Sequence, residues 1–309
     1  MDLSTRYLGL DLPHPFMPGA SPLVDDLDMV LRLEDAGAAA IVMNSLFEED
    51  IARYDVVPDR YLEHLLRVKR RTRVPVIASL NGTTTEGWLK YAKLIETAGV
   101  DALELNFYYI ATDLSESAAS VERRVIDIVA VLKESIAIPI AVKLSPFYSS
   151  LPHLADQLDR IGADGLVLFN RFYQADINPE TCGTSPVLAL SDSSELLLRL
   201  RSIAILFGRV HASLALTGGV HETTDAVKAV MAGADAVQIV SALLEHGPGR
   251  LAHILGEFRR WGDQHGYGSV REMRGRVSLA RSSNPADFER GNYIRVLQSW
   301  RGPGVVAGH

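Results

Sequence analysis

The sequence of 309 residues has a single cysteine, Cys182, no long apolar run and no excess of basic residues. One cysteine excludes an intrachain disulfide and favours a reducing compartment. It also excludes a cysteine cluster that could hold iron and sulfur. No apolar stretch approaches the roughly 20 residues that span a membrane, and the first residues have no signal-peptide pattern. We therefore expect a soluble, cytoplasmic protein without membrane contact.

Other signals are missing as well. The formal net charge of −7 argues against nucleic acid or an anionic surface as the main partner. There is no Gly-x-Gly-x-x-Gly fingerprint for a second nucleotide, and no pair of histidines has metal-ligand spacing, so we predict no metal. Apolar residues make up 47 % of the chain, enough to bury a large core. This length suits one α/β barrel, for which about 250 residues is typical.

An internal repeat indicates the architecture. Four times, a helical pattern ends on a glycine and is followed at once by an apolar strand. These glycines are Gly37, Gly99, Gly162 and Gly233, spaced 62, 63 and 71 residues apart. Each stands where a helix end favours a left-handed residue. With a second kind of strand between them, eight strands are predicted, at residues 16–20, 39–44, 75–80, 102–107, 139–145, 165–170, 213–218 and 236–241.

The repeat favours one fold class. Continuous apolar strands that alternate with helices indicate a buried parallel sheet. The glycine spacing is about the length of two βα units, which favours an α/β fold of the (β/α)8 TIM-barrel type over a doubly wound open sheet. Because no linker interrupts the pattern, we predict one barrel domain over residues 1–267 and a short C-terminal tail over residues 268–309.

The segment 213–244 carries the strongest sign of a ligand. One apolar strand ends at Gly218-Gly219, a helical pattern follows, and the next apolar strand ends at Ser241-Ala242. Paired glycines expose backbone N–H groups, and two such turns side by side make a cradle for an anion. In a (β/α)8 barrel this is the position of the phosphate site. We therefore predict a phosphate-carrying ligand at these four residues.

Asparagine stands at four predicted strand ends, although it is depleted in strands. A single asparagine there is most often a turn residue, whereas four that converge on one face indicate recognition. A primary amide offers a donor and an acceptor side by side, which matches the edge of an imide, a pyrimidine or an isoalloxazine ring. The four residues are Asn44, Asn81, Asn106 and Asn170.

Lys143 is a single charge within an apolar strand. An unpaired buried ammonium is costly, so the side chain either extends its head to water or serves a function. The functional options are a Schiff-base nucleophile, a phosphate partner, or a cation that stabilises charge developing on a cofactor.

With these residues together, the chain resembles the dihydroorotate dehydrogenase family, an FMN-dependent set of (β/α)8 barrels, and above all its soluble class 1. The order and spacing of short motifs carry the resemblance. They are FMPGAS (16–21), ELN (104–106), VKLSP (142–146), FN (169–170), LTGGV (216–220) and GADAVQIVSAL (233–243).

The resemblance implies FMN as cofactor, a planar pyrimidine-like substrate and a homodimer. It implies that the FMN phosphate lies on Gly218, Gly219, Ser241 and Ala242, and that Lys143 lies near the flavin N1/O2 edge. Asn44, Asn106 and Asn170 would contact the substrate. The further cofactor-binding residues would be Ala20, Ser21, Asn81 and Asn106.

The chain departs from the family pattern on the substrate side. Members carry a catalytic cysteine or serine three residues after the asparagine of strand four, where this chain has Tyr109. The family's lysine on strand two is replaced by Asn44. A phenol is a weak base but a usable acid, so Tyr109 is either a proton donor, as in an ene-reductase, or a packing residue.

Three hypotheses follow. The first is an FMN-dependent oxidoreductase of the dihydroorotate dehydrogenase type, or a relative with another substrate, in which Tyr109 and Lys143 are the catalytic residues. The second is a flavin-free isomerase or lyase that uses Lys143 as an amine. The third is a flavin-binding protein without catalysis. The first needs a diffusible electron acceptor or a separate reductase, because the chain carries no electron relay of its own.

Overall fold

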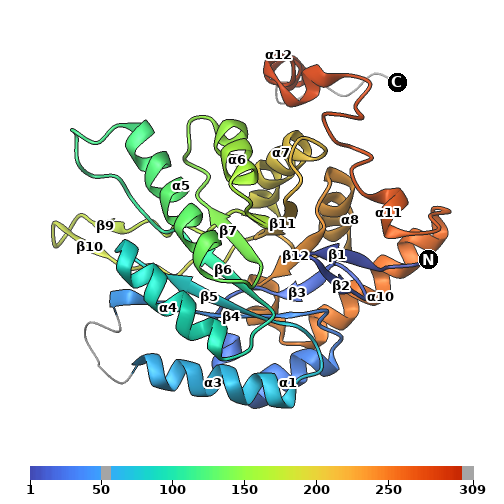
Figure 1. Ribbon diagram of the computed structural model, residues 1–309. Helices are drawn as coiled ribbons and strands as arrows, with labels where there is room; N and C mark the ends of the chain where they lie inside the picture. The colour runs from blue at the N-terminus through green and yellow to red at the C-terminus, as the bar shows by residue number, and fades with distance from the viewer. Residues whose placement is uncertain (50–56, 301–309) are drawn as a thin grey trace.

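The structure is a computed structural model that describes residues 1–49 and 57–300. Eight parallel strands form one sheet that curls into a nearly closed barrel with helices outside it (Figure 1). The predicted (β/α)8 fold is confirmed, and each predicted strand is found. The strands are β3 (Phe16–Pro18), β4 (Ile41–Phe47), β5 (Val76–Asn81), β6 (Ala102–Asn106), β7 (Ile140–Leu144), β8 (Gly165–Leu168), β11 (Ser213–Thr217) and β12 (Ala236–Ile239).

The sheet is parallel throughout, in the order β3-β12-β11-β8-β7-β6-β5-β4. Its two outer strands approach one another where the Ala39 amide donates to the Phe16 carbonyl oxygen at 3.0 Å. The covering helices are α1 (Leu27–Asp35), α3 (Val57–Arg71), α4 (Thr85–Thr97), α5 (Ala118–Ser135), α6 (Leu151–Arg160), α7 (Leu196–Leu206), α8 (Thr223–Ala232) and α10 (Gly249–Gln264).

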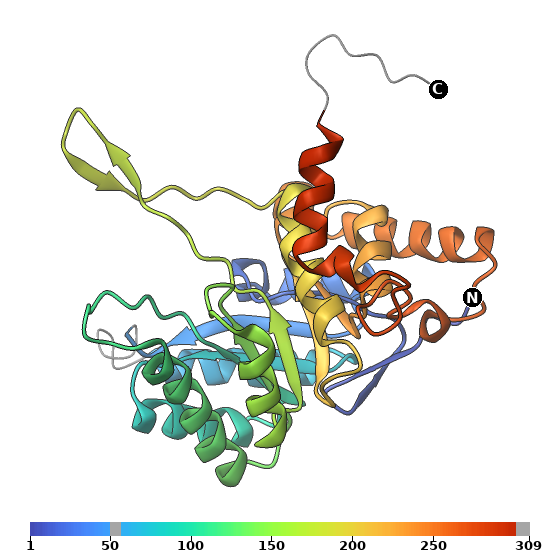
Figure 2. The ribbon, with the colours of Figure 1, turned by 90° about the horizontal axis from the view of Figure 1, so that it is seen from above.

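Shorter elements surround the barrel. A hairpin of β1 (Thr5–Tyr7) and β2 (Leu10–Leu12) precedes it, and a second hairpin of β9 (Asp176–Asn178) and β10 (Gly183–Ser185) extends far from the body in Figure 2. The remaining elements are η1 (Pro22–Asp25), η2 (Ser193–Glu195), α9 (Ser241–His246), α11 (Val270–Met273), η3 (Pro285–Phe288) and α12 (Arg290–Ser299).

The four repeat glycines have the backbone that the sequence predicted. Their φ angles are +94°, +75°, +91° and +130° for Gly37, Gly99, Gly162 and Gly233. A side chain would strain this conformation, so glycine lets each helix stop and the chain turn directly into the next strand.

Three of these turns also share an aspartate two residues after the glycine. Each aspartate carboxylate accepts a hydrogen bond from the first or second amide of the preceding strand and pairs with a basic side chain, while its own amide donates back to that strand. This repeated set of hydrogen bonds and an ion pair, called a clasp below, holds the amino ends of the strands together. The sets are Asp101 with Val76 and Lys69, Asp164 with Ile140 and Lys133, and Asp235 with Leu214 and Arg274.

The interior of the barrel has an apolar lower layer and a polar upper layer. The lower layer is made of small and branched side chains such as Ala102, Ala141 and Ala215, and the β1–β2 hairpin closes it from below with Tyr7 and Leu8. A Cβ atom on Gly165 would lie 2.5 Å from Leu8 Cδ2, so the hairpin fits only because that residue is glycine. The upper layer comprises Ser79, Glu104, Lys143 and Gln238, all buried.

The C-terminal segment divides into a packed part and an exposed part. Val270 and Met273 of α11 are buried in the main core, and the Leu279 amide donates to the Ala204 carbonyl oxygen of α7 at 2.9 Å. The helix α12, in contrast, has no buried residue and projects from the body in Figure 2. The boundary predicted between residues 267 and 268 therefore precedes a segment that still contacts the barrel. No helix among residues 1–49 and 57–300 is both long and apolar enough to cross a membrane.

Candidate active site

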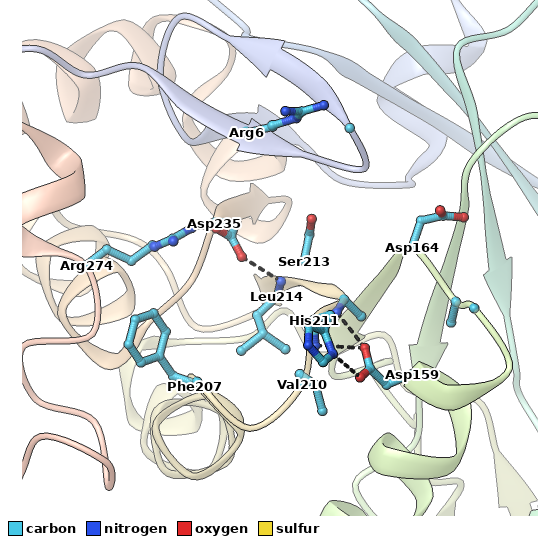
Figure 3. A pocket seen from close by; sticks show the side chains of 15 residues that line it. Arg6, Asp159, Asp164, Phe207, Val210, His211, Ser213, Leu214, Asp235 and Arg274 are labelled. Atoms are coloured by element: carbon cyan, nitrogen blue, oxygen red, sulfur yellow. Dashed lines mark hydrogen bonds and ion pairs between the residues drawn. The ribbon is translucent and has the colours of Figure 1, made fainter.

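A cavity of about 640 Å³ lies at the amino ends of the strands, beside the β1–β2 hairpin (Figure 3). Its acidic groups are already engaged. Asp159 accepts from the amides of His211 and Ala212 at 2.8 and 2.7 Å, and Asp164 and Asp235 belong to the clasps described above. These carboxylates hold the framework together. The chemistry of (β/α)8 barrels takes place at the opposite end, where the strands finish.

At that carboxyl end, three buried polar side chains from three strands are connected. Lys143 Nζ of β7 donates to Glu104 Oε1 of β6 at 3.1 Å, and Gln238 Nε2 of β12 donates to Glu104 Oε2 at 2.6 Å. Glu104 is fully buried and Lys143 is 6 % exposed. The lysine therefore has a buried counter-charge, which the sequence analysis did not recognise.

Two of the predicted asparagines meet. Asn170 follows β8 and donates from Nδ2 to Asn106 Oδ1 at the end of β6, and also to the Phe107 carbonyl oxygen at 3.3 Å. Asn106 Nδ2 donates to Ser45 Oγ at 3.1 Å, and Ser45 Oγ is 2.7 Å from Ser79 Oγ. Both asparagines are at most 9 % exposed.

This arrangement leaves a specific pair of groups available. Asn170 Oδ1 accepts no hydrogen bond from the part of the chain that the structure describes, and one N–H of Asn106 Nδ2 is also unused. A free acceptor and a free donor on two touching amides match the N–H and C=O of an imide edge. The pair can thus bind one edge of a planar heterocycle.

Asn44 lies elsewhere. The prediction that strand two ends at Asn44 is wrong, because β4 continues to Phe47 with an irregular register between Val42 and Ser45. Asn44 Nδ2 donates to both carboxylate oxygens of Asp25, at 3.1 and 3.2 Å, and its Oδ1 accepts from the Ser45 amide. The irregularity gives Ser45, rather than Asn44, the contact with Asn106.

The predicted phosphate turns lie together, and they include a serine that the sequence analysis missed. Ser191, from the segment before α7, donates from its Oγ to Ser241 Oγ at 2.8 Å. The Gly219 amide is 3.3 Å from Ser191 Oγ, and the Ser191 amide donates to Ser241 Oγ at 3.0 Å. Ala242 is the second residue of α9 and is fully buried. Hydroxyl and amide groups therefore meet at one point.

The backbone of this turn leaves no room for a side chain at either glycine. Gly218 and Gly219 have φ angles of +89° and +78°. A Cβ atom on Gly218 would lie 2.8 Å from the guanidinium of Arg199, and one on Gly219 would lie 2.7 Å from the Leu196 amide nitrogen. Arg199 is 6 % exposed and donates to the Thr217 carbonyl oxygen at 2.6 Å. A buried cation thus underlies the turn.

Tyr109 points to α5. Its hydroxyl donates to Glu116 Oε2 at 2.5 Å, and the Arg124 guanidinium lies 4.3 Å from its ring centre. The neighbouring Tyr108 stacks on Phe172 with ring centres 4.3 Å apart. Tyr109 is 45 % exposed, so the loop presents it to solvent with its hydroxyl already paired.

The remaining predicted residues lie near the mouth of the barrel. Ser21 follows β3 and is 4 % exposed, and its Oγ has no hydrogen-bond partner among the described residues. Ala20 precedes it and packs against the lower interior cluster. Asn81 ends β5 and is 5 % exposed.

Four site residues were missed, and two of them had a visible signal. Glu104 and Gln238 interrupt apolar strands. Glu104 lies two residues before Asn106, so strand alternation places these two side chains on the same face of β6. Ser45 and Ser191 had no comparable signal. Their positions depend on the irregularity in β4 and on a long connection between β8 and α7.

Comparison with known proteins indicates the same protein family as the sequence motifs do. The family model for dihydroorotate dehydrogenase matches residues 55–261. The catalytic subunit of dihydroorotate dehydrogenase B (NAD(+)) from Thermoplasma volcanium is 27 % identical over 305 residues, covering 89 % of this chain and 98 % of the relative. The NAD-dependent dihydropyrimidine dehydrogenase subunit PreA of Escherichia coli K12 is 23 % identical over 319 residues, covering 89 % and 76 %.

The dihydropyrimidine dehydrogenase (NADP(+)) of Arabidopsis thaliana is 22 % identical over 367 residues, covering 99 % of this chain and 86 % of the relative. A (β/α)8 barrel with polar side chains gathered at the carboxyl ends of its strands is the architecture of an enzyme. The chain belongs to the dihydroorotate dehydrogenase family. It is an oxidoreductase of the class that acts on CH–CH groups.

Proposed function

We propose that this protein is an FMN-dependent oxidoreductase that interconverts a CH–CH bond and a C=C bond in a planar, pyrimidine-like heterocycle. The observation that carries the proposal is the Asn106–Asn170 pair, with its free donor and acceptor, in the same barrel mouth as Lys143. Membership of the family supports the reaction class.

The residues present fit FMN. A phosphate would accept a hydrogen bond from the Ser241 hydroxyl, whose oxygen accepts from the Ser191 hydroxyl and amide, above the buried Arg199. The buried and unpartnered Ser21 Oγ supports a polar ligand beside β3. When bound, FMN supplies hydride transfer, and Lys143 supplies a cation where negative charge gathers on the reduced ring. Ala20, Asn81, Gly218 and Ala242 complete the proposed cofactor site.

The substrate is bound by its edge. Asn170 Oδ1 accepts from a ring N–H, and Asn106 Nδ2 donates to a ring carbonyl oxygen. A ring without these groups would leave the Asn170 Oδ1 acceptor and one Asn106 N–H unpaired, which costs about 1–3 kcal/mol for each group. The site therefore selects dihydropyrimidine-like rings over alicyclic alkenes.

Proton transfer falls to Tyr109 in this proposal. Its hydroxyl already has Glu116 as acceptor, and Arg124 pairs with the same carboxylate. A neutral phenol can donate a proton to a substrate carbon, which suits reduction of a C=C bond better than proton abstraction. We therefore propose the reductive direction as the alternative to dihydroorotate oxidation.

Electrons must come from or go to another molecule. The relative in Thermoplasma is named a catalytic subunit and that in Escherichia coli is named a subunit. We propose that this chain also works with a separate reductase or a diffusible electron acceptor, as a homodimer in the cytoplasm. Size-exclusion chromatography with light scattering tests the dimer.

The test is anaerobic mixing of the FMN-loaded protein with dihydroorotate and, separately, with 5,6-dihydrouracil. Bleaching of the visible flavin band by one of them identifies an oxidised substrate. If neither bleaches the flavin, dithionite-reduced protein is mixed with orotate, uracil and a simple enoate, and return of the band identifies a reduced substrate. FMN that none of these compounds reduces or reoxidises would contradict the proposed activity. A protein that binds no FMN contradicts the cofactor.

A further inference from the structure

Glu104 and Lys143 form a buried ion pair beneath the mouth of the barrel. Glu104 has no exposed surface, and its two carboxylate oxygens receive hydrogen bonds from Lys143 at 3.1 Å and from Gln238 at 2.6 Å. Three strands, β6, β7 and β12, supply one residue each. The ion pair joins two neighbouring strands, β6 and β7, and Gln238 reaches Glu104 from β12 on the other side of the barrel.

Stability alone does not explain this pair. Removing two charges from water costs several kcal/mol for each ion, and replacement of a buried pair by apolar residues is often neutral or stabilising. The layer directly below is filled with Ala102, Ala141 and Ala215, and shows that this barrel closes with small apolar side chains. The cost of the pair therefore points to a role in the site.

The charge network borders the expected cofactor position. A Cβ atom on Gly19 would lie 3.1 Å from Gln238 Cβ and 3.2 Å from Gln238 Oε1, so Gln238 lies against the segment that leads to Ser21. Gln238 Oε1 is buried and has no hydrogen-bond partner among residues 1–49 and 57–300. The network thus contacts the same segment that carries the unpartnered Ser21 hydroxyl.

The negative charge of Glu104 also affects the pKa of Tyr7, which lies in the layer below it. Burial, with the Glu104 charge as a second cause, raises the pKa of the Tyr7 phenol well above its ordinary value. Tyr7 is the hairpin residue that closes the lower layer, and its hydroxyl has no hydrogen-bond partner among the described residues. Among residues 1–49 and 57–300, Lys143 is the only cationic side chain that pairs with this carboxylate.

We propose that Glu104 is a positioning residue which holds the Lys143 ammonium at the flavin edge and partly offsets its charge. Gln238 donates to the second carboxylate oxygen of Glu104 and carries no charge. The inference rests on the proposed function. It assigns the flavin reduction potential to a pair of opposite charges and not to a lone cation.

The test measures the midpoint potential of bound FMN by anaerobic equilibration with a reference dye. Glu104→Gln leaves one uncompensated positive charge and should raise the ratio of reduced to oxidised flavin about tenfold at fixed potential, about 30 mV for a two-electron couple. Lys143→Met leaves one uncompensated negative charge and should lower that ratio about tenfold. The double variant should return to within about threefold of the wild type.

Two controls separate charge from geometry. Gln238→Met removes a hydrogen bond from Glu104 without changing the charge, and should shift the ratio less than about threefold. Asp164→Asn removes a carboxylate that likewise pairs with a lysine, Lys133, but at the opposite end of the barrel. This variant should leave the midpoint potential unchanged. Shifts of both single variants in the same direction, or loss of FMN affinity without a shift, overturn the inference.

A second readout does not use FMN. In the flavin-free protein, Lys143→Met leaves a buried carboxylate without its ion partner and should lower the urea concentration at the midpoint of unfolding. Adding Glu104→Gln to Lys143→Met should recover most of that loss. If the double variant is no more stable than Lys143→Met, the two groups are not coupled and the inference fails. Absence of FMN binding by the wild type instead overturns the proposed function.

Discussion

The Tyr109 hydroxyl donates a hydrogen bond to Glu116 Oε2 at 2.5 Å, and the Arg124 guanidinium pairs with the same carboxylate while lying over the tyrosine ring. The family's catalytic residue stands at this offset from the strand-four asparagine. In this chain the position carries a phenol whose proton already has an acceptor, joined to the first turns of α5.

Tyr109→Phe tests whether this phenol takes part in the reaction. If Tyr109 is the proton donor, the variant should reduce substrate at least about 100-fold more slowly, with FMN affinity unchanged. Single-turnover reoxidation of the reduced flavin measures that step. Tyr108→Phe is the matched control, because it removes a neighbouring hydroxyl and keeps the stack on Phe172. An unchanged rate in Tyr109→Phe would assign Tyr109 to packing.

Asn170→Ala should weaken substrate binding about tenfold to 100-fold, because it removes the free acceptor and one partner of Asn106. FMN should stay bound. Asn44→Ala provides the control, since Asn44 is held by Asp25 and should change substrate affinity less than about threefold. Titration of each FMN-loaded variant with product, followed by flavin absorbance, gives the dissociation constant for that variant. A larger effect at Asn44 than at Asn170 would reverse the proposed assignment.

Gly218→Ala should reduce FMN affinity at least about 100-fold, because the new Cβ meets the Arg199 guanidinium and strains a backbone at φ +89°. Gly99→Ala has a comparable positive φ of +75°, but its Cβ would meet no atom within 4 Å. It should cost about 1 kcal/mol of stability and leave FMN affinity unchanged. Quenching of FMN fluorescence on binding measures affinity. Equal losses in the two variants would mean that backbone strain, and not the turn under the phosphate, is responsible.

Burial lowers the pKa of the His14 imidazole to about 4, and Arg259 adds to the shift against an opposing hydrogen bond at Gly37. The unfolded chain therefore binds a proton between about pH 4 and 6.5 that the folded protein does not. The contribution of the neutral His14 ring to the free energy of unfolding is fully present above pH 6.5 and is lost as the pH falls toward 4.

Between pH 7.5 and 5 this loss should amount to about 2 kcal/mol of unfolding free energy. Urea unfolding at the two pH values measures it. His14→Gln, which keeps an acceptor for the Phe16 amide that now donates to Nδ1, should show a smaller difference. A variant with the same pH dependence as the wild type would assign the loss to other groups.

The repeat of apolar strands and glycines was sufficient to predict the barrel. Four of the covering helices end at Gly37, Gly99, Gly162 or Gly233, and the strand that follows each is found where expected, because these signals lie within a few neighbouring residues. The paired glycines and the asparagines at strand ends were local signals of the same kind. The end of strand two was misplaced at Asn44, because a register irregularity is set by the neighbouring strand and not by the local sequence.

Within the site, the sequence alone determined which residue types stand at the strand ends, and Lys143 and Asn106 are found at the barrel mouth for that reason. Only the tertiary structure decided which of them meet. Gln238 and Glu104 are 134 positions apart, and closure of the sheet brings β12 across from β6 so that they share a hydrogen bond. Partners selected by closure leave no mark on the neighbouring sequence, whereas helix ends and strand alternation do, because they arise from the backbone of adjacent residues.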